Sequence, residues 1–258
     1  MILEHKSAKI FYSVTGTGEP VVLLHGFLES STMWDNLIED LSEKNQVITI
    51  DLLGHGQTDC LGYVHTMTDF ANAVNTVLNH LKISTFKIIG HSLGGYIALA
   101  LAELNPNAIK SLCLMNSTTE ADSKDRIDLR NRAIKTAKKQ YTGLVSMSIS
   151  NLFFEENRKT FANKIEALKI EALKTPVQGY IAAQEGMKIR PNQTEFFKTA
   201  KFNKYIIAGK KDPVLDFETI KNISLRCNAT FIGLKGGHMS QIEDLADLKP
   251  ALLQFVNN

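Results

Sequence analysis

A G-x-S-x-G sequence between an apolar run and a helical pattern constrains the fold of this chain more than any other feature. It reads G-H-S-L-G over residues 90–94 and follows the apolar run Phe86–Ile89. A sharp turn from a buried strand into a helix holds such a serine in a strained conformation, with its oxygen exposed at the end of a sheet. Side chains two residues before and after Ser92 would collide with neighbouring backbone, which explains Gly90 and Gly94. The stretch predicts a nucleophile, with a simple helix cap at Ser92 as the alternative.

Short apolar runs alternate with longer helical patterns, as in a mostly parallel sheet built from βα units. The predicted strands are Ile10–Val14, Val21–Leu24, Val47–Ile50, Phe86–Ile89, Ile109–Met115, Lys204–Ala208 and Ala229–Leu234. The first two are joined by a turn rich in glycine, and we expect them to form a hairpin. Thr66 and Asp69 predict a capping box at the start of a helix. The last helix contains Pro250, which is tolerable only in the first turn.

The pattern changes between the fifth and sixth predicted strands, where no strand is expected and charged residues crowd together. Helical patterns cover Arg126–Tyr141 and Asn157–Lys174 in this stretch. We therefore expect one α/β domain, a mostly parallel central sheet flanked by helices, with an inserted helical cap. The predicted core comprises residues 1–116 and 191–258, and the predicted cap comprises residues 117–190.

Charge and apolar patterning exclude several classes of partner. Lys and Arg total 29 and Asp and Glu total 27, so the formal charge of +2 gives no surface suited to nucleic acid. The longest apolar run, Tyr96–Ala102, is far shorter than the roughly 20 residues of a membrane-spanning helix. Glu4 and the absence of a signal-like stretch at the N-terminus predict a cytoplasmic protein without membrane contact. The chain has three cysteines, expected to be unpaired thiols, and their spacing fits no metal site: Cys60, Cys113 and Cys227.

A serine nucleophile needs a base, most often a histidine that a carboxylate orients. Of seven histidines, only His238 follows the last predicted strand, on a glycine-containing loop at the carboxyl edge of the sheet. Asp212 ends the preceding strand and is the expected orienting acid, with Asp216 as the fallback. His91 adjoins the serine, but its side chain is expected to point away from it. Three histidines are expected at the surface: His5, His65 and His80.

The order Ser92, Asp212, His238 is that of α/β-hydrolases, and the sequence resembles this superfamily over nearly its whole length. Further motifs that carry the resemblance are H-G-F at residues 25–27 and D-L-L-G-H-G at residues 51–56. The resemblance implies an oxyanion hole formed by the backbone N–H groups of Phe27 and Leu93. The sequence has no H-E-x-x-H or clustered Cys/His pattern, no phosphate loop and no G-x-G-x-x-G after a strand, so no metal or other cofactor is expected.

The resemblance also implies a serine hydrolase that acts on a small carboxylic ester or thioester through an acyl-enzyme on Ser92. The cap is expected to supply the substrate pocket, although the same side chains would also suit its own packing. The candidate lining residues are Tyr141, Met147, Leu152, Phe153, Phe154 and Phe161.

Besides the serine hydrolase, two other kinds of function remain open: a lyase or carbon–carbon bond hydrolase that uses the same triad, and a non-catalytic module. The chain partly resembles the menaquinone-pathway synthase, a lyase of this fold, and shares with it a basic start of the cap: Arg126, Arg130 and Arg132. That synthase usually has Tyr before the serine and Arg after the second glycine, where this chain has His91 and Tyr96. Carbon–carbon bond hydrolases of the fold usually have Asn in place of His91. A non-catalytic module that binds a small ligand is the third possibility, and the oligomeric state is open.

Overall fold

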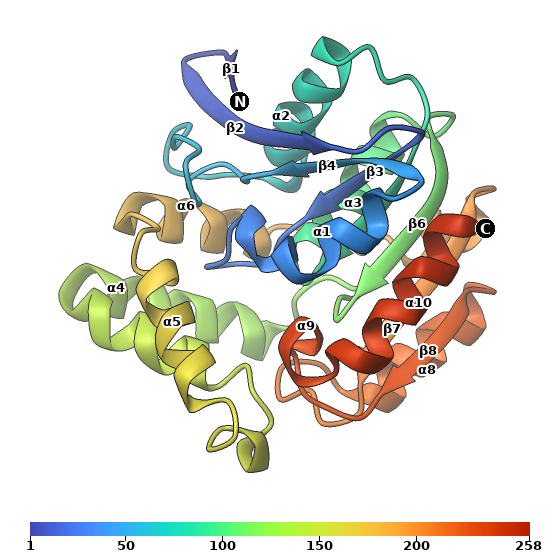
Figure 1. Ribbon diagram of the computed structural model, residues 1–258. Helices are drawn as coiled ribbons and strands as arrows, with labels where there is room; N and C mark the ends of the chain where they lie inside the picture. Colours follow the sequence, from blue (N-terminus) through green and yellow to red (C-terminus); the bar gives the residue numbers. More distant parts are fainter.

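A single eight-stranded sheet runs through the computed structural model, which describes residues 1–258 (Figure 1). The strands are β1 (Ile2–His5), β2 (Ala8–Thr15), β3 (Glu19–Leu24), β4 (Asn45–Ile50), β5 (Phe86–His91), β6 (Ile109–Met115), β7 (Asn203–Gly209) and β8 (Thr230–Leu234). Their order in the sheet is β1-β2-β4-β3-β5-β6-β7-β8. The pairs β1–β2 and β2–β4 are antiparallel, and all others are parallel. The predicted mostly parallel sheet is confirmed.

The hairpin expected between the first two predicted strands, which are β2 and β3 of the structure, is wrong. Strand β4 lies between β2 and β3, antiparallel to the first and parallel to the second. The connecting turn packs closely on the chain just before β4, since a Cβ at Gly18 would lie 2.3 Å from the carbonyl oxygen of Lys44. Gly18 also has a φ of +120°, a backbone conformation that glycine alone adopts readily. The turn therefore passes over the start of β4, and the hairpin in this sheet is β1–β2.

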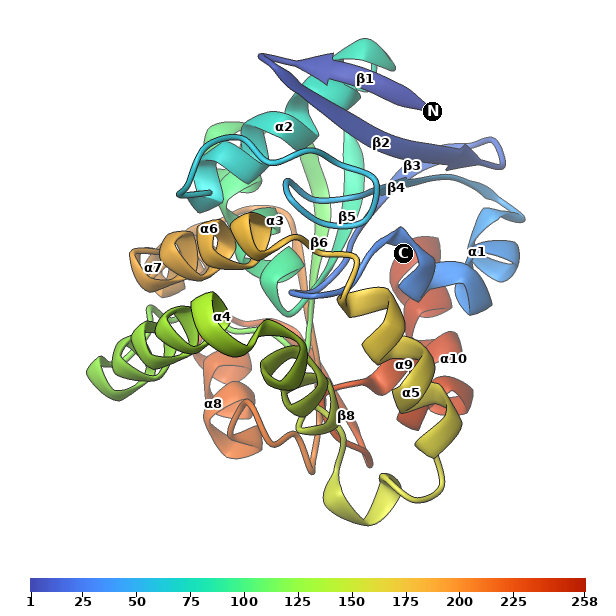
Figure 2. The same cartoon turned by 90° about the vertical axis from the view of Figure 1, so that its left-hand side faces the viewer.

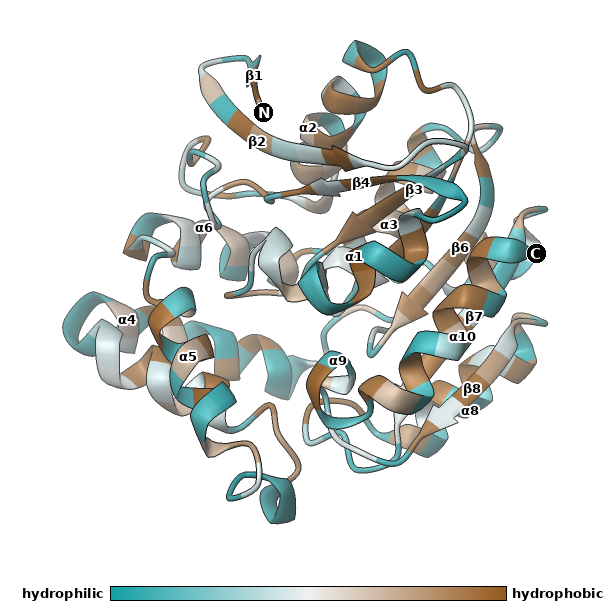
Figure 3. Cartoon of the chain, viewed as in Figure 1, coloured by the Kyte–Doolittle hydropathy of each residue, from teal (hydrophilic) through white to brown (hydrophobic).

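Alternate side chains of the central strands enter two cores, one on each face of the sheet. In β3, Val22 and Leu24 belong to the larger core, whereas Val21 and Leu23 belong to the smaller one. Figure 3 shows the hydrophobic colour concentrated in strands such as β3 and β6. Helices α2 (Met67–His80), α3 (Leu93–Leu104) and α8 (Phe217–Arg226) cover the first core, and η1 (Ser31–Trp34), α1 (Asp35–Ser42) and α10 (Leu245–Asn257) cover the second.

The chain between β6 and β7 contains helices and no strand. These helices are α4 (Lys124–Ser150), η2 (Glu155–Asn157), α5 (Ala162–Ala172), α6 (Val177–Lys188) and α7 (Thr194–Thr199). Figures 1 and 2 show α4, α5 and α6 grouped at one end of the sheet, on the side toward which β3 points. A third apolar cluster joins them to the rest of the protein through Leu28 and Met239. The non-helical angles of Gln140 mark a kink within α4.

Helix ends agree with the sequence prediction at one site and differ at another. Thr66 and Asp69 form the predicted capping box, in which each side chain accepts the backbone N–H of the other residue at 3.0 Å. Helix α10 begins at Leu245, directly after α9 (Ser240–Glu243), so Pro250 lies in its second turn and the expected first-turn position is wrong. Leu248 and Leu252 are fully buried on either side of the proline, and their packing stabilises the helix despite the missing N–H donor.

Two histidines that were expected at the surface are buried. His65 has no exposed area, and its Nε2 accepts the N–H of Leu61 at 3.0 Å. His5 is 9% exposed, and its Nδ1 lies 2.7 Å from Thr76 Oγ1. Both rings are enclosed by distant segments of the chain, which local sequence does not reveal. The three cysteines are free thiols, and no helix is long and apolar enough to cross a membrane.

Candidate active site

Ser92 occupies a strained turn between β5 and α3. Its φ of 50° and ψ of −112° are unusual for a residue with a side chain, a conformation that costs about 1–3 kcal/mol. A Cβ at Gly90 would lie 2.3 Å from the carbonyl oxygen of Gly94, and one at Gly94 would lie 2.3 Å from that of Leu24. Only glycine fits these two positions, so the turn has the close approach that the sequence motif predicts.

Ser92, His238 and Asp212 form a hydrogen-bonded series with His238 in the middle. His238 Nε2 is 2.9 Å from Ser92 Oγ, and His238 Nδ1 is 2.7 Å from Asp212 Oδ2. The side chains of His238 and Asp212 are each 2% exposed. A neutral imidazole that donates from Nδ1 to the carboxylate can accept the serine proton at Nε2. The structure thus brings together three side chains from the ends of β5, β7 and β8.

Hydrogen bonds keep the Asp212 carboxylate charged. Burial alone would raise the pKa of Asp212, but the adjacent His238 and the donors around it hold this pKa below its usual range. Oδ1 accepts the N–H groups of Val214 at 2.7 Å and Leu215 at 3.1 Å. The fallback acid, Asp216, lies elsewhere: it caps α8 by accepting the N–H of Thr219 at 2.8 Å.

Asn116, which sequence reasoning missed, supports the carboxylate. Its Nδ2 donates to Asp212 Oδ2 at 3.1 Å and to the carbonyl oxygen of Gly237 at 3.2 Å. Its Oδ1 accepts from Ser240 Oγ at 2.7 Å. Asn116 is the first residue after β6 and has a φ of 45°. A polar residue directly after a buried strand, at the same sheet edge as Ser92, is the signal that would have identified it.

The backbone N–H groups of Phe27 and Leu93 have no acceptor among the turn, loop and cap hydrogen bonds of the chain. Leu93 is the first residue of α3, so its N–H points out of the helix N-terminus. Phe27 lies in the wall of the cavity that contains Ser92. The neighbouring amide of Gly26 is engaged, because it donates to Glu29 Oε2 at 2.7 Å.

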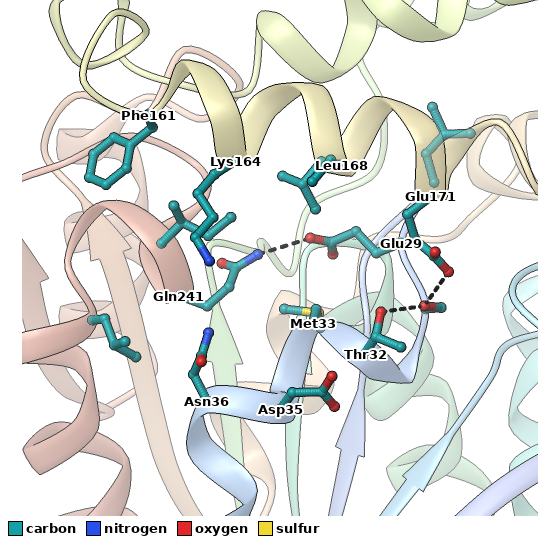
Figure 4. A pocket seen from close by; sticks show the side chains of 15 residues that line it. Glu29, Thr32, Met33, Asp35, Asn36, Phe161, Lys164, Leu168, Glu171 and Gln241 are labelled. Atoms are coloured by element: carbon teal, nitrogen blue, oxygen red, sulfur yellow. Dashed lines mark hydrogen bonds between the residues drawn. The ribbon is translucent and has the colours of Figure 1, made fainter.

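A buried network connects the serine turn to the His238 loop. His91 Nδ1 lies 2.8 Å from Glu29 Oε2, and His91 Nε2 lies 3.0 Å from the carbonyl oxygen of His238. Gln241 Nε2 donates to Glu29 Oε1 at 2.9 Å, as Figure 4 shows. His91 and Glu29 are 1% and 4% exposed. Glu29 was not singled out from the sequence, because a carboxylate in a loop after a strand is normally solvated.

The His91–Glu29 contact is an ion pair. Both ring nitrogens of His91 face oxygen atoms, so both hydrogen bonds form when the ring carries two protons. Burial lowers the pKa of His91, but the Glu29 carboxylate outweighs it and the pKa lies above the usual 6.5. Burial likewise raises the pKa of Glu29, but His91 opposes this and the pKa lies below the usual 4.5. When it carries both protons, His91 donates to Glu29 and to the carbonyl oxygen of His238 at the same time.

The cavity at Ser92 has a volume of about 110 Å³. Of the six residues predicted to line it, only Leu152 does so. Phe153 is fully buried, Met147 is 57% exposed, and the Tyr141 hydroxyl donates to the backbone of Thr175. The prediction is wrong for these residues and Phe154 because they serve packing or face solvent. The wall comprises Phe27, Leu28, Glu29, His91, Ser92, Tyr96, Arg126, Arg130, Ser148, Leu152, Met187, Val214 and His238.

A larger cavity of about 580 Å³ lies between α5 and the segment that contains η1 and the start of α1 (Figure 4). Phe161, the sixth predicted residue, lines this cavity instead. Leu28 and Glu29 belong to the walls of both cavities. Glu171 crosses from α5 to accept from Ser30 Oγ at 3.0 Å. No group of three His, Cys, Asp or Glu side chains is arranged to hold a metal ion.

Comparisons with known proteins agree with the fold. A family model described as alpha/beta hydrolase fold matches residues 19–245. A thermophilic esterase from Thermogutta terrifontis superposes with a TM-score of 0.92 and 26% identity, over 97% of this chain and 93% of the esterase. The enol-lactonase from Burkholderia xenovorans gives a TM-score of 0.92 at 18% identity, over the full length of both chains.

Curated relatives match over shorter segments. An uncharacterized protein of Mycobacterium tuberculosis is 34% identical over 106 residues, 41% of this chain and 31% of that protein. The pimeloyl-[acyl-carrier protein] methyl ester esterase of Nitrosomonas europaea is 33% identical over 112 residues, 43% of this chain and 42% of the esterase. The matched segments thus span less than half the length of these relatives.

Proposed function

Because the chain belongs to the alpha/beta hydrolase fold family, we propose that it is a serine hydrolase of a small carboxylic ester or thioester. The observation that carries the proposal is the unbroken hydrogen-bonded series from Ser92 Oγ through His238 to Asp212, at 2.9 and 2.7 Å. Such a series turns an ordinary alcohol into a nucleophile. The similarity to esterases of this fold supports the same reaction class.

In the proposed reaction, Ser92 Oγ attacks the carbonyl carbon while His238 Nε2 takes the hydroxyl proton. Asp212 stabilises the resulting imidazolium through Nδ1. His238 then returns the proton to the departing alcohol or thiol, which leaves an acyl-enzyme on Ser92. A water molecule then gives a proton to His238 Nε2 and attacks the acyl carbon, and His238 returns this proton to Ser92 Oγ as the acid leaves.

The negative charge that develops on the carbonyl oxygen needs donors that are not already engaged. The N–H groups of Phe27 and Leu93 meet this requirement, since neither has an acceptor among the loop and cap hydrogen bonds. Leu93 also stands at the N-terminus of α3, where the helix dipole favours negative charge. We assign the oxyanion hole to these two amides, each contributing about a hundred- to thousand-fold in rate.

Residues 117–190 act in this proposal as a cap on a core formed by residues 1–116 and 191–258. The support is that side chains from this stretch complete the cavity at Ser92: Arg126, Arg130, Ser148, Leu152 and Met187.

A fluorophosphonate probe and short p-nitrophenyl esters test the proposal. The wild-type protein should be labelled and should hydrolyse the esters, and Ser92→Ala should remove labelling and lower kcat/KM by several orders of magnitude. Ser148→Ala is the matched control, because this second serine of the same cavity donates its hydroxyl to the carbonyl oxygen of Leu144 and should not be the labelled residue. Unchanged turnover in the folded Ser92→Ala variant would refute the nucleophile. A wild-type protein that resists the probe would instead favour a ligand-binding module.

A further inference from the structure

We propose that the cavity at Ser92 selects substrates that carry a free carboxylate, such as half-esters or half-thioesters of small dicarboxylic acids, and that Arg126 binds this carboxylate. The inference rests on the proposed ester hydrolysis at Ser92 and specifies its substrate class. It comes from the balance of charge in the cavity wall, which contains Arg126 and Arg130 together with Ser92 and His238.

Arg126 has no carboxylate partner. Its Nη2 donates to the carbonyl oxygen of Val214, and it takes part in none of the ion pairs of the chain. A guanidinium has five N–H donors, so most of those on Arg126 remain available. Arg126 is also in the first turn of α4, where the helix dipole disfavours positive charge. The helix therefore gains nothing from a cation at this position.

Arg130, one turn further along α4, is already engaged but leaves positive charge in excess. It pairs through Nε with Asp122 and donates from Nη1 to Gln184 Oε1 at 2.8 Å. Asp122 also pairs with Arg190 Nη1 at 2.6 Å, and its side chain is fully buried. One carboxylate thus serves two guanidinium groups, and it has no capacity to neutralise Arg126 as well.

The other carboxylates near the cavity have partners of their own. Glu29 pairs with His91 at 2.8 Å, and Asp212 pairs with His238 at 2.7 Å. Asp125 and Asp128 flank Arg126 on α4 but are exposed, and no carboxylate of the protein forms an ion pair with it. A half-buried charge without a partner is costly, and an anionic substrate that supplies the partner gains that free energy on binding.

The chemistry of the free group indicates a carboxylate. The two parallel N–H bonds of a guanidinium edge match the two oxygens of a carboxylate. One unengaged arginine balances a single negative charge, whereas a phosphate dianion would need a second cation, and the donors of Arg130 are largely occupied. Ser92 and Arg126 line the same cavity. A substrate whose carbonyl carbon lies at Ser92 Oγ therefore reaches Arg126 when a short chain joins its carboxylate to that carbonyl.

The test compares monomethyl glutarate, which is anionic at pH 7.5, with the neutral dimethyl glutarate, by measuring the methanol released. The wild-type protein should show at least a tenfold higher kcat/KM for the anionic ester. Arg126→Gln should lower the ratio of the two values ten- to hundred-fold, the effect of losing a charge-assisted hydrogen bond. Arg132→Gln, at an exposed position of the same helix, is the matched control and should leave the ratio unchanged.

Two outcomes overturn the carboxylate site: a wild-type enzyme that does not prefer the anionic ester, or an Arg126→Gln variant that keeps the wild-type ratio. If Arg126→Gln does not fold, Arg126→Lys replaces it, and a ratio below the wild-type value is expected because lysine lacks the planar fork. Calorimetric titration of glutarate into Ser92→Ala separates this proposal from the proposed function. If neither ester is cleaved but glutarate binds, and binds at least tenfold more weakly after Arg126→Gln, then the hydrolase assignment fails and the site stands. Glutarate binding that Arg126→Gln leaves unchanged refutes the site.

Discussion

Glu29→Gln is the substitution that best tests the buried contact between Glu29 and His91, which in turn contacts the backbone of His238. Glutamine has nearly the same shape as glutamate, so it can still accept the Gly26 N–H and contact Gln241, whose Oε1 is a buried acceptor without a partner. It removes only the negative charge that keeps His91 doubly protonated. The buried ring then loses a proton, and a single N–H must serve two oxygens, one on residue 29 and one on the backbone of His238.

The expected loss of stability follows from that count of donors. One buried acceptor is left unpaired, which costs about 1–3 kcal/mol, and weaker bonds from Gly26 and Gln241 add to it. We expect a total of about 3 kcal/mol, at the lower end of the 3–5 kcal/mol for removing one partner of a buried ion pair. At about 2–4 °C per kcal/mol for a chain of this size, Tm should fall by roughly 6–12 °C.

The loss of stability caused by Glu29→Gln should depend on pH, and the directions of the two pKa shifts determine how. The pKa of His91 is raised above 6.5, so its stabilising contribution is complete below pH 6.5 and is lost as pH rises through the higher folded-state pKa. The pKa of Glu29 is lowered below 4.5, so its contribution is complete above pH 4.5 and is lost as pH falls through the lower folded-state value. The difference in Tm between wild type and Glu29→Gln should therefore be largest between pH 4.5 and 6.5 and should shrink toward pH 9.

Thermal unfolding at pH 5.5 and at pH 9, together with kcat/KM for p-nitrophenyl acetate, measures both consequences. We expect kcat/KM to fall about tenfold, because the His238 backbone loses its donor and small displacements of a catalytic group are costly. Glu171→Gln is the matched control: this carboxylate lines the neighbouring cavity but is 24% exposed and pairs with Lys174 at the surface. A Tm difference that does not change between the two pH values would show that His91 is not held as a cation, and the reasoning would fail.

Two further substitutions, and a third that serves as a control, test the packing around the site. Asp122→Asn should destabilise the protein by about 3 kcal/mol at pH 7, because it leaves the buried Arg190 and the half-buried Arg130 without a counter-charge. Hydrogen bonds and ion pairs hold the pKa of Asp122 below 3.8 against the effect of burial, so urea unfolding should show a smaller difference from wild type at pH 3. Gly186→Ala should prevent folding or lower Tm by more than about 10 °C, because the added Cβ would lie 1.6 Å from the carbonyl oxygen of His65. Gly143→Ala, where a Cβ meets nothing within 4 Å, should fold and should raise Tm slightly in the same assay.

The elements that sequence predicted well are those whose signal is local. The predicted strand Ile109–Met115 has the same bounds as β6, because its last four residues, Leu112–Met115, form an apolar run that is buried on both faces of the sheet. Strand β1 was missed, since it is a four-residue edge strand whose side chains are mostly exposed or half-exposed. The prediction that β2 and β3 form a hairpin was wrong for a different reason. Which strands are neighbours in a sheet depends on the packing of β4 beside β3, and no residue of the turn between β2 and β3 encodes it.

The contrast between local sequence signals and tertiary packing also separates the predicted site residues from the missed ones. Ser92, Asp212 and His238 each follow a strand of one parallel sheet, so strand prediction alone places them at a common edge. The lining of the cavity was predicted poorly, because helix faces in the segment between β6 and β7 are selected by packing of α4 against α5 and α6. Arg126 and Arg130 have the sequence appearance of a solvated helix face, but they belong to the cavity wall.

Glu29 and Asp122 show why buried charges near a site are the hardest features to predict. Each lies in a loop directly after a strand or before a helix, where a carboxylate is ordinarily solvated. Each is buried by a partner distant in sequence: His91 lies 62 residues from Glu29, and Arg190 lies 68 residues from Asp122. Local patterns therefore identify the groups that react, but the charges that fix those groups in place are determined by tertiary packing. Substitutions at Glu29 and Asp122 should for this reason alter stability and activity together, whereas Ser92→Ala should alter activity alone.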